Sequence, residues 1–205
     1  MIGCYTTDME EDNRIVDFLF EIGTMRKLMR MHRQTLLTDD ASDSIASHSY
    51  RVSIIGWYLA KKEGADLYKT VMMGLLHDMA EARSGDHNWV HKKYIKIFTE
   101  EIIKEQFGTL PYPDFAELVN EYNKRESKES VLAKDADLLD QMLLLREYEW
   151  QGNKEAEIWL KGKSGDRENA QFAKLKTESA KKLGRAILKE DPSGWWNNIW
   201  TPENR

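Results

Sequence analysis

Three ionisable side chains lie close together in an otherwise apolar stretch of the sequence. His77 and Asp78 are adjacent and follow a run of apolar residues, and Glu81 comes four residues after His77. On a helix, all three overhang one edge. Charged groups in a core helix are costly unless something pairs with them, and a divalent metal is one such partner. A hydrogen-bonded pair near a helix end is the simpler interpretation of the His-Asp dipeptide taken alone.

Two further motifs change that balance. His48 lies in Ser-Ile-Ala-Ser-His-Ser-Tyr-Arg, at the start of a predicted helix roughly thirty residues before His77. Asp137 lies in Lys-Asp-Ala-Asp-Leu-Leu-Asp, roughly sixty residues after His77, where acidic residues interrupt a helix with a strongly apolar face. The order is therefore a histidine, a His-Asp pair and an aspartate, each on its own predicted helix.

This order resembles that of the HD-domain metal-dependent phosphohydrolases. Arg33, the motif around His48, and His-Asp-Met-Ala-Glu followed by Gly85-Asp86 resemble more narrowly the 5′-deoxynucleotidase branch of that family. The resemblance covers residues 26–86 and 131–145. It implies a compact all-α helical bundle and an enzyme that hydrolyses phosphate esters with the help of a metal.

The resemblance also implies one divalent metal ion, bound by His48, His77, Asp78 and Asp137. Two nitrogen and two carboxylate ligands leave open coordination positions, and a metal there lowers the pKa of bound water and neutralises phosphate charge. Manganese, cobalt, nickel, magnesium and zinc are all candidates for this ion.

The remaining site residues are expected to act on the substrate. The resemblance implies that Glu81 is the acid/base beside the attacking water and that Asp86 is a second acidic group near the leaving oxygen or the sugar. It places Arg33 on the phosphate, since a planar guanidinium matches phosphate oxygens; a surface arginine at a helix end is the alternative. Lys134 is placed to touch phosphate or to form an ordinary salt bridge with the nearby acids.

The function expected from these residues is removal of phosphate from nucleoside or deoxynucleoside 5′-monophosphates, which are small-molecule substrates. One alternative is a non-catalytic helical module that binds a nucleotide or a protein through the same pocket. Another is an HD enzyme acting on a different phosphate ester, such as a cyclic dinucleotide or (p)ppGpp, although the short chain and the lack of an attached sensor region count against it.

The hydrophobic pattern predicts that helices position these residues, because apolar residues recur at three- and four-residue steps and no alternating stretch indicates a strand. Asp66 is expected to cap the third helix, in which Leu67, Val71, Leu75 and Met79 fall four residues apart. The predicted helices are Asn13–Met29, Ser47–Glu63, one from Asp66 to Gly85, His91–Phe107, Asp114–Arg125, Ser130–Tyr148 and Arg167–Lys189.

Composition excludes several classes of protein. The chain has 205 residues, of which 41% are hydrophobic and 32% charged, which predicts a flexible lead over 1–12 and a single helical domain over 13–205. No apolar run approaches the ~20 residues of a membrane span. A net charge of −5 argues against broad nucleic-acid binding. The single cysteine, Cys4, rules out an internal disulfide and fits a reducing cytosol, so we expect a cytoplasmic protein.

Two groups of residues stand outside this scheme. Trp195, Trp196 and Trp200 are too apolar to extend freely into solvent, so they are expected to dock onto the body or onto a second subunit in a homodimer. His87 and His91 share a helical face at four-residue spacing, and we interpret them as rim residues rather than as a second metal site.

Overall fold

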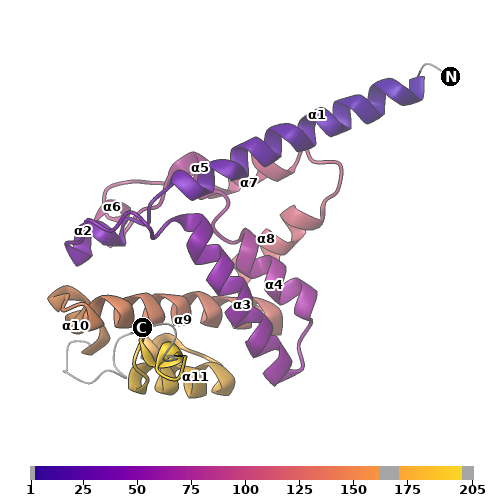
Figure 1. Cartoon of the computed structure of the whole chain (residues 1–205). Helices are drawn as coiled ribbons and strands as arrows, with labels where there is room; N and C mark the ends of the chain where they lie inside the picture. The colour runs from indigo at the N-terminus through magenta and orange to yellow at the C-terminus, as the bar shows by residue number, and fades with distance from the viewer. Residues whose placement is uncertain (1–2, 162–170, 200–205) are drawn as a thin grey trace.

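The computed structural model describes residues 3–161 and 171–199, and these residues form helices joined by loops (Figure 1). Within them the one β pairing is a single bridge between Met29 and Ser44. The all-α prediction is therefore confirmed. No helix in the described ranges has both the length and the apolar character needed to cross a membrane. The α-helices are α1 Gly3–Gly23, α2 His32–Leu36, α3 Ile45–Glu63, α4 Leu67–Leu76, α5 Glu81–Ser84, α6 Trp89–Lys92, α7 Thr99–Phe107, α8 Asp114–Lys124, α9 Lys128–Trp150, α10 Lys154–Lys161 and α11 Glu178–Lys189.

Helix α9 is the central element, and α3, α4, α8, α10 and α11 pack against it (Figure 1). Its apolar side chains contribute to three clusters: one shared with α3 and α11, one that extends to α1, α4, α7 and α8, and one shared with α2 and α10. Because neighbouring helices cover α9 on most sides, its acidic residues are buried wherever those helices pack against them.

Local signals fix the end of α3 and the start of α4 as the sequence predicts. Ser44 and Ser47 form a reciprocal capping box at the start of α3, and Gly64 ends this helix in the left-handed conformation at φ 63°. The side chain of Asp66 then accepts a hydrogen bond from the Lys69 N–H and caps α4. These caps hold the two helices as a tight antiparallel pair.

The third helix is shorter than predicted and buries a different face. Helix α4 ends at Leu76, and a turn followed by the short helix α5 replaces its last predicted turns. Leu75, one of the apolar residues spaced four apart, is 38% exposed, while Met73 and Gly74 are buried. The cause is close packing on α3, since a Cβ atom at Gly74 would lie 3.2 Å from the Ser53 Cα. His77 therefore caps the end of α4 instead of lying within a longer helix.

Other boundaries also differ from the prediction. Helix α1 begins at Gly3, so residues 3–12 are helical rather than a flexible lead, and it ends at Gly23 before the predicted Met29. The predicted helix His91–Phe107 is divided into α6 and α7 by the loop 93–98. Helix α10 was not predicted. Of the predicted helix Arg167–Lys189, residues 167–170 lie outside the described residues, and the remainder forms a short 3₁₀ turn at Phe172–Lys174 and α11.

Asp135 joins the last helix to the body. The residue is 1% exposed. Its carboxylate accepts hydrogen bonds from the Lys176 N–H at 2.9 Å, the Thr177 N–H at 2.8 Å and the Thr177 hydroxyl at 2.7 Å. Asp135 thereby fixes the start of α11 against α9.

Replacing Asp135 by alanine should destabilise the fold, because it leaves buried donors without an acceptor. We expect the free energy of unfolding to fall by about 1–3 kcal/mol or more, measured by urea denaturation. The exposed Asp39 provides the control, and Asp39→Ala should change stability by less than about 0.5 kcal/mol. Equal stability of the two variants would contradict this role.

Candidate metal centre

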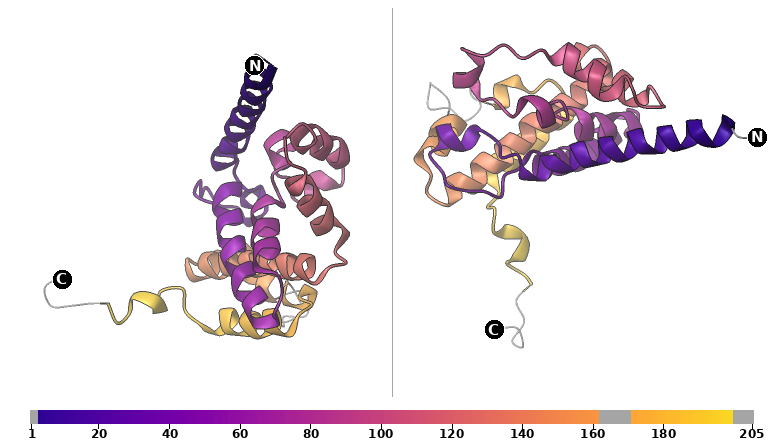
Figure 2. Two further views of the ribbon diagram at one scale, coloured as in Figure 1. Left: turned by 90° about the vertical axis from the view of Figure 1, so that its right-hand side faces the viewer. Right: turned by 90° about the horizontal axis from the view of Figure 1, so that it is seen from above.

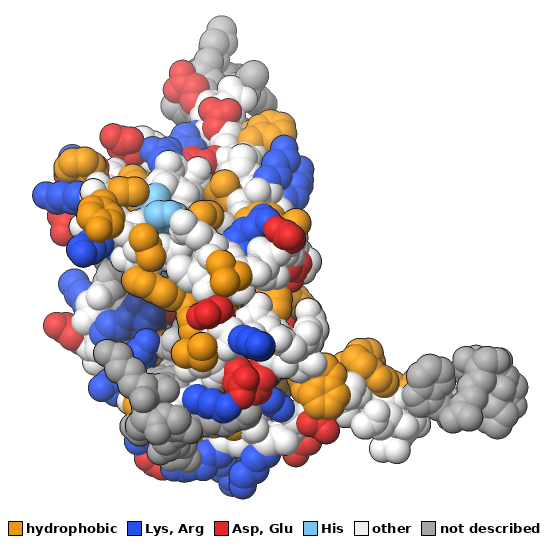
Figure 3. Space-filling view, turned by 90° about the vertical axis from the view of Figure 1, so that its left-hand side faces the viewer, with side chains coloured by type: hydrophobic (Ala, Val, Ile, Leu, Met, Phe, Trp, Pro, Cys, Tyr) orange, Lys and Arg blue, Asp and Glu red, His pale blue; other side chains and the backbone are white. Residues whose placement is uncertain are grey.

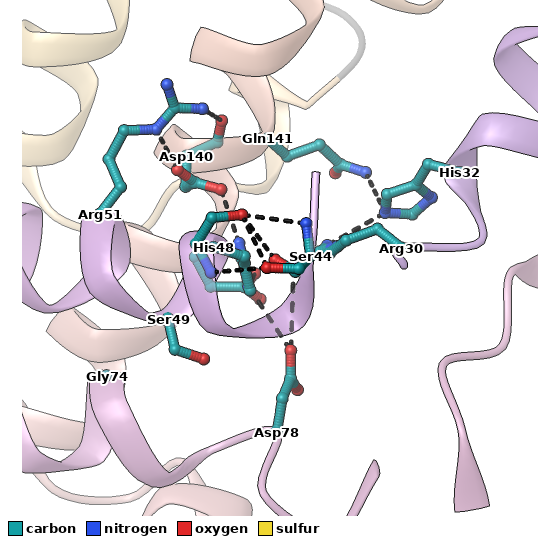
Figure 4. A network of polar contacts seen from close by, with 12 residues as sticks. Arg30, His32, Ser44, His48, Ser49, Arg51, Gly74, Asp78, Asp140 and Gln141 are labelled. Carbon is teal, nitrogen blue, oxygen red and sulfur yellow. Dashed lines mark hydrogen bonds and ion pairs between the residues drawn. The ribbon is translucent and has the colours of Figure 1, made fainter. Parts of the chain in front are cut away.

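His48 is held in the first turn of α3 by a buried carboxylate. The residue is 2% exposed, and its Nδ1 lies 2.5 Å from Oδ2 of Asp140 on α9 (Figure 4). Because a carboxylate can only accept, Nδ1 carries the proton and Nε2 presents a lone pair. Arg51, one turn further along α3, donates to the other oxygen of Asp140 and to Glu147 at 2.6 Å. The chain Arg51–Asp140–His48 therefore sets both the tautomer and the orientation of the imidazole.

His77 has the same tautomer for a different reason. Its Nδ1 donates to the backbone carbonyl of Gly74 at 2.8 Å, one turn earlier at the end of α4. In the neutral ring its Nε2 therefore also carries a lone pair, and this atom lies 3.2 Å from the Nε2 of His48. Two lone pairs facing each other repel unless a cation lies between or beside them.

Asp78 and Asp137 each bring a carboxylate close to the two Nε2 atoms, although Asp137 lies outside the tightest group of potential ligands. Oδ2 of Asp78 lies 3.1 Å from Nε2 of His77 and 3.5 Å from Nε2 of His48. Oδ1 of Asp137 lies 3.3 Å from Nε2 of His48 and 3.9 Å from Nε2 of His77. Candidate ligand atoms of His48, His77 and Asp78 all lie within 4.8 Å of one another. Two neutral imidazoles and two carboxylates match the ligand chemistry of a divalent first-row metal.

The pKa values of these groups reflect the same attraction for positive charge. Burial and the charge of Arg30 lower the pKa of His48, but hydrogen bonds with Asp137, Asp140 and Asp78 outweigh them and raise it well above its usual value. Burial raises the pKa of Asp78, and contacts with His77 and His48 more than reverse the effect and hold it well below the usual range. In the absence of a metal, a proton is the cation that this arrangement favours.

Lys134 contacts the cluster from the solvent side. Its Nζ lies 2.5 Å from Oδ2 of Asp137, one turn away on α9, and its side chain is 42% exposed. This contact is the salt bridge that the sequence offered as one of two alternatives. The exposed ammonium group can still be approached by a ligand.

Arg30 is the arginine that lies against the cluster. It is 8% exposed, and its Nη1 lies 4.0 Å from Oδ2 of Asp78, while its Nε and Nη1 have no hydrogen-bond partner within the described chain. The bridge between Met29 and Ser44 places it there, since Arg30 N–H donates to the Asp43 carbonyl at 2.9 Å. Sequence reasoning selected Arg33 instead, which lies on α2, where its charge lowers the pKa of Asp40 after the larger effects of Ser42, burial and Tyr148.

His32 supports Arg30 rather than lying on the surface. Its Nε2 is 3.1 Å from Nη2 of Arg30 and 3.1 Å from Nε2 of Gln141 (Figure 4). Burial, followed by the charge of Arg30, lowers the pKa of His32 to about 4. The ring therefore stays neutral and accepts from the guanidinium.

Glu81 and Asp86 lie on the side of the cluster formed by α5 and the loop after it. Oε2 of Glu81 is buried and has no hydrogen-bond partner among the described residues. Burial and the charges of Asp78 and Asp86 raise the pKa of Glu81 from 4.5 to about 9. Oδ2 of Asp86 accepts from the Met31 N–H at 2.5 Å, which fastens this loop to the segment that carries Arg30.

His87 and His91 pack against each other, with ring centroids 5.6 Å apart. Nε2 of His87 donates to the carbonyl of Ser84 at 2.9 Å. Both rings are half-buried, and the groups of potential metal ligands found in the described residues do not include them.

Sequence reasoning missed two residues that shape the centre: Arg30 and Arg51. Arg51 carries a recognisable signal, because it follows His48 by one helical turn, as Asp140 follows Asp137. A polar residue one turn after a ligand, on an otherwise buried helix face, indicates a group that faces the same site. Arg30 carries no such signal, since an irregular segment positions it.

Replacing Asp140 by asparagine should weaken metal binding while the fold is retained. The amide cannot draw the Nδ1 proton of His48 as a carboxylate does, so the imidazole loses its fixed orientation. We expect the Kd for Mn²⁺ or Co²⁺, measured by isothermal titration calorimetry, to rise roughly 10- to 100-fold. Glu147→Gln is the matched control, because Glu147 contacts Arg51 but not His48. Equal metal affinity in the two variants would show that Asp140 does not position the ligand.

The metal-free protein should lose stability through Glu81 as the pH rises. Because the folded-state pKa of about 9 lies above the ordinary 4.5, the folded chain holds a proton that the unfolded chain releases. The stabilising effect is complete below pH 4.5 and disappears as the pH approaches 9. Glu81→Gln cannot titrate, so its stability relative to wild type should increase across this interval in urea denaturation with a chelator present. A difference that does not change with pH would refute the raised pKa.

Comparison with known proteins places this arrangement in a family. The sequence profile described as the HD domain matches residues 25–178, which contain every candidate ligand described above. The chain is also 30% identical over 122 residues to a 5′-deoxynucleotidase, HDDC2, from Dictyostelium discoideum. That alignment covers 53% of this chain and 64% of the relative, so the match extends over less than two thirds of the relative's length.

Solved structures share the fold over nearly the whole chain. A conserved hypothetical protein from Pyrococcus furiosus is 26% identical with a TM-score of 0.67, covering 85% of this chain and 99% of that one. A predicted metal-dependent phosphohydrolase from Magnetospirillum magnetotacticum has the same fold, with 24% identity and a TM-score of 0.63 over 87% of this chain and 91% of its own. Together with the profile match, which the order of the histidine and aspartate motifs predicted, these likenesses show that the chain belongs to the HD-domain family.

Proposed function

We propose that this protein is a metal-dependent phosphomonoesterase that acts on nucleoside or deoxynucleoside 5′-monophosphates. The observation that carries the proposal is the convergence of two Nε2 lone pairs and two carboxylates, with Arg30 and Glu81 beside them. Nε and Nη1 of Arg30 and Oε2 of Glu81 are buried without a hydrogen-bond partner in the described residues, which is unusual in a folded protein and typical of groups that serve a ligand.

His48, His77, Asp78 and Asp137 are the proposed ligands of one divalent ion. A bound ion supplies Lewis acidity, which makes water a better nucleophile and offsets the negative charge of phosphate. Lys134 neutralises part of the charge on Asp137 from outside. Asp140 keeps His48 in the tautomer that metal binding requires.

Glu81 is the proposed acid/base. At neutral pH its raised pKa leaves the metal-free carboxyl protonated, and positive charge introduced beside it shifts the group toward the carboxylate. A pKa that responds to the charge in the site suits a group that takes a proton from water and returns one to the leaving oxygen. Asp86 fixes the loop that faces it and is a second acidic group on the same side.

Arg30 is the proposed phosphate-binding residue. Its guanidinium is buried beside Asp78, His32 and the neighbouring chain hold it in place, and it has donors to spare. Phosphate bound there would satisfy these donors and compensate the burial of the cation. Arg33 and Lys134 are the cationic residues that the sequence favoured for this role.

The substrate class rests on the name of the relative. The Dictyostelium protein is called a 5′-deoxynucleotidase, and its aligned region is 30% identical to this chain. The direct test measures phosphate release from a panel of ribo- and deoxyribonucleoside 5′-monophosphates with Mn²⁺, Co²⁺, Mg²⁺, Ni²⁺ or Zn²⁺ added separately. Turnover of these monophosphates with at least one metal supports the proposal. Metal binding without any turnover favours the non-catalytic module, and turnover of a cyclic dinucleotide or (p)ppGpp alone favours another phosphate ester.

Glu81→Gln should retain metal but lose most of its activity. The substitution keeps the size of the side chain and removes its acid/base capacity, so kcat should fall about 10²- to 10⁴-fold. Metal content by mass spectrometry should equal that of wild type. Near-normal kcat across pH in this variant would exclude Glu81 as the acid/base.

Arg30→Lys and Arg33→Lys together identify the residue that binds phosphate. Lysine keeps the positive charge but loses the planar array of donors. We expect Arg30→Lys to lower kcat/KM for nucleotides roughly 10- to 100-fold, while Arg33→Lys stays near wild type. The reverse result would restore Arg33 to the role that the sequence predicted. A loss in neither variant would direct attention to Lys134.

A further inference from the structure

Two tryptophans from different parts of the chain lie next to the histidine that supports Arg30. Trp159 on α10 packs edge-on against His32 on α2, with ring centroids 5.7 Å apart. Trp89 on α6 packs in turn against Trp159, with centroids 4.7 Å apart and ring planes inclined at 52°. Figure 1 and the view from above in Figure 2 show α2 beside α10 at one end of the molecule. Three helices thus bring an imidazole and two indoles into one row.

The segment that carries Trp89 is fastened to the backbone beside Arg30. Asn88, the residue before Trp89, is 2% exposed, and its side-chain oxygen caps α6. The amide of the same side chain donates to the Met31 carbonyl at 3.0 Å, while Asp86 accepts from the Met31 N–H at 2.5 Å. Because Met31 follows Arg30 directly in the chain, these two hydrogen bonds fix the backbone of Trp89 relative to that of the arginine.

Both indoles leave ring surface open to solvent. Trp89 is 53% exposed, and Trp159 is half-buried. Figure 3 looks onto the side of the molecule that carries α2, α6 and α10, and hydrophobic side chains gather there around exposed histidine atoms. An open indole face stacks well on the flat ring of a nucleobase, and proteins use aromatic side chains in this way to hold bases of any kind.

The row that leads from Arg30 to Trp159 also lacks hydrogen-bond acceptors. A guanidinium can only donate, so Nε2 of His32 accepts from Nη2 of Arg30 at 3.1 Å, and the neutral ring carries its proton on Nδ1. This Nδ1 is buried without a partner among the described residues, as are Nε and Nη1 of Arg30. Buried donors without acceptors are unusual in folded proteins. A phosphorylated sugar carries several oxygens that accept hydrogen bonds, so it suits the space beside this row.

We propose that Trp89 and Trp159 form the surface on which the base of the nucleotide substrate stacks while its phosphate lies at Arg30. This inference rests on the proposed function, because it takes a nucleoside 5′-monophosphate as the ligand. One imidazole ring, that of His32, separates the guanidinium from Trp159. In the nucleotide, one five-membered sugar ring likewise separates the phosphate from the base. The order of charged, polar and aromatic groups along the protein therefore follows the order of groups along the ligand.

Binding without turnover tests this surface. The ligand is the 5′-methylenephosphonate of deoxyadenosine, in which carbon replaces the ester oxygen so that no phosphate is released, and its Kd is measured calorimetrically on the full-length protein with Mn²⁺. Trp89→Leu keeps an apolar side chain but removes the aromatic face, so Kd should rise roughly 5- to 100-fold. Trp89→Phe should recover most of the affinity. Trp57→Leu, at a tryptophan that is 48% exposed on α3, is the control and should bind as wild type does.

A ligand without a base separates stacking from phosphate binding. The matching phosphonate of deoxyribose alone should bind wild type and Trp89→Leu equally, because it has no ring to stack. Equal losses for both ligands, an unchanged Kd of the nucleotide analogue in Trp89→Leu, or a wild type that does not bind this analogue would each overturn the proposal. A protein that binds the analogue through Trp89 but releases no phosphate from any monophosphate would keep the stacking surface and lose the proposed enzymatic activity.

Discussion

Two imidazole lone pairs that face each other inside the protein are the constraint on which the centre depends. His48 and His77 each use Nδ1 to donate a hydrogen bond, one to Asp140 and the other to the Gly74 carbonyl, so both Nε2 atoms are left as acceptors 3.2 Å apart. No proton of their own relieves the repulsion while both rings are neutral. The negative charge of the nearby carboxylates further favours a cation at this position, either a proton or a metal ion.

The packing of α3 on α4 brings the Nε2 atoms of His48 and His77 together. Gly74 allows the two helices to approach until a side chain no longer fits between them, and the same residue supplies the carbonyl that orients His77. The cap at Ser44 starts α3 just before His48, and His77 stands where α4 ends. The ligands therefore lie at helix termini, where the backbone turns away and leaves room, while α9 brings Asp137 and Asp140 from the other side.

The centre could be predicted to the extent that its signals are local. The order of His48, His77-Asp78 and Asp137 identified the family, and capping residues located α3 and the start of α4. Of the apolar residues spaced four apart on the predicted third helix, Met79 is buried but Leu75 is exposed, because close helix packing turns Gly74 toward α3. Likewise, the family resemblance pointed to Arg33, whereas a backbone bridge between Met29 and Ser44 turns Arg30 toward Asp78. Features set by contacts between distant segments leave no periodic trace in the sequence.

The most direct measurement is a crystal structure of the Mn²⁺- or Co²⁺-loaded protein, with anomalous scattering recorded at the absorption edge of the metal. We expect a single strong anomalous peak within about 2.0–2.3 Å of Nε2 of both His48 and His77, with carboxylate oxygens of Asp78 and Asp137 completing the protein ligands. A peak elsewhere in the molecule, or coordination through Nδ1 of either histidine, would contradict it.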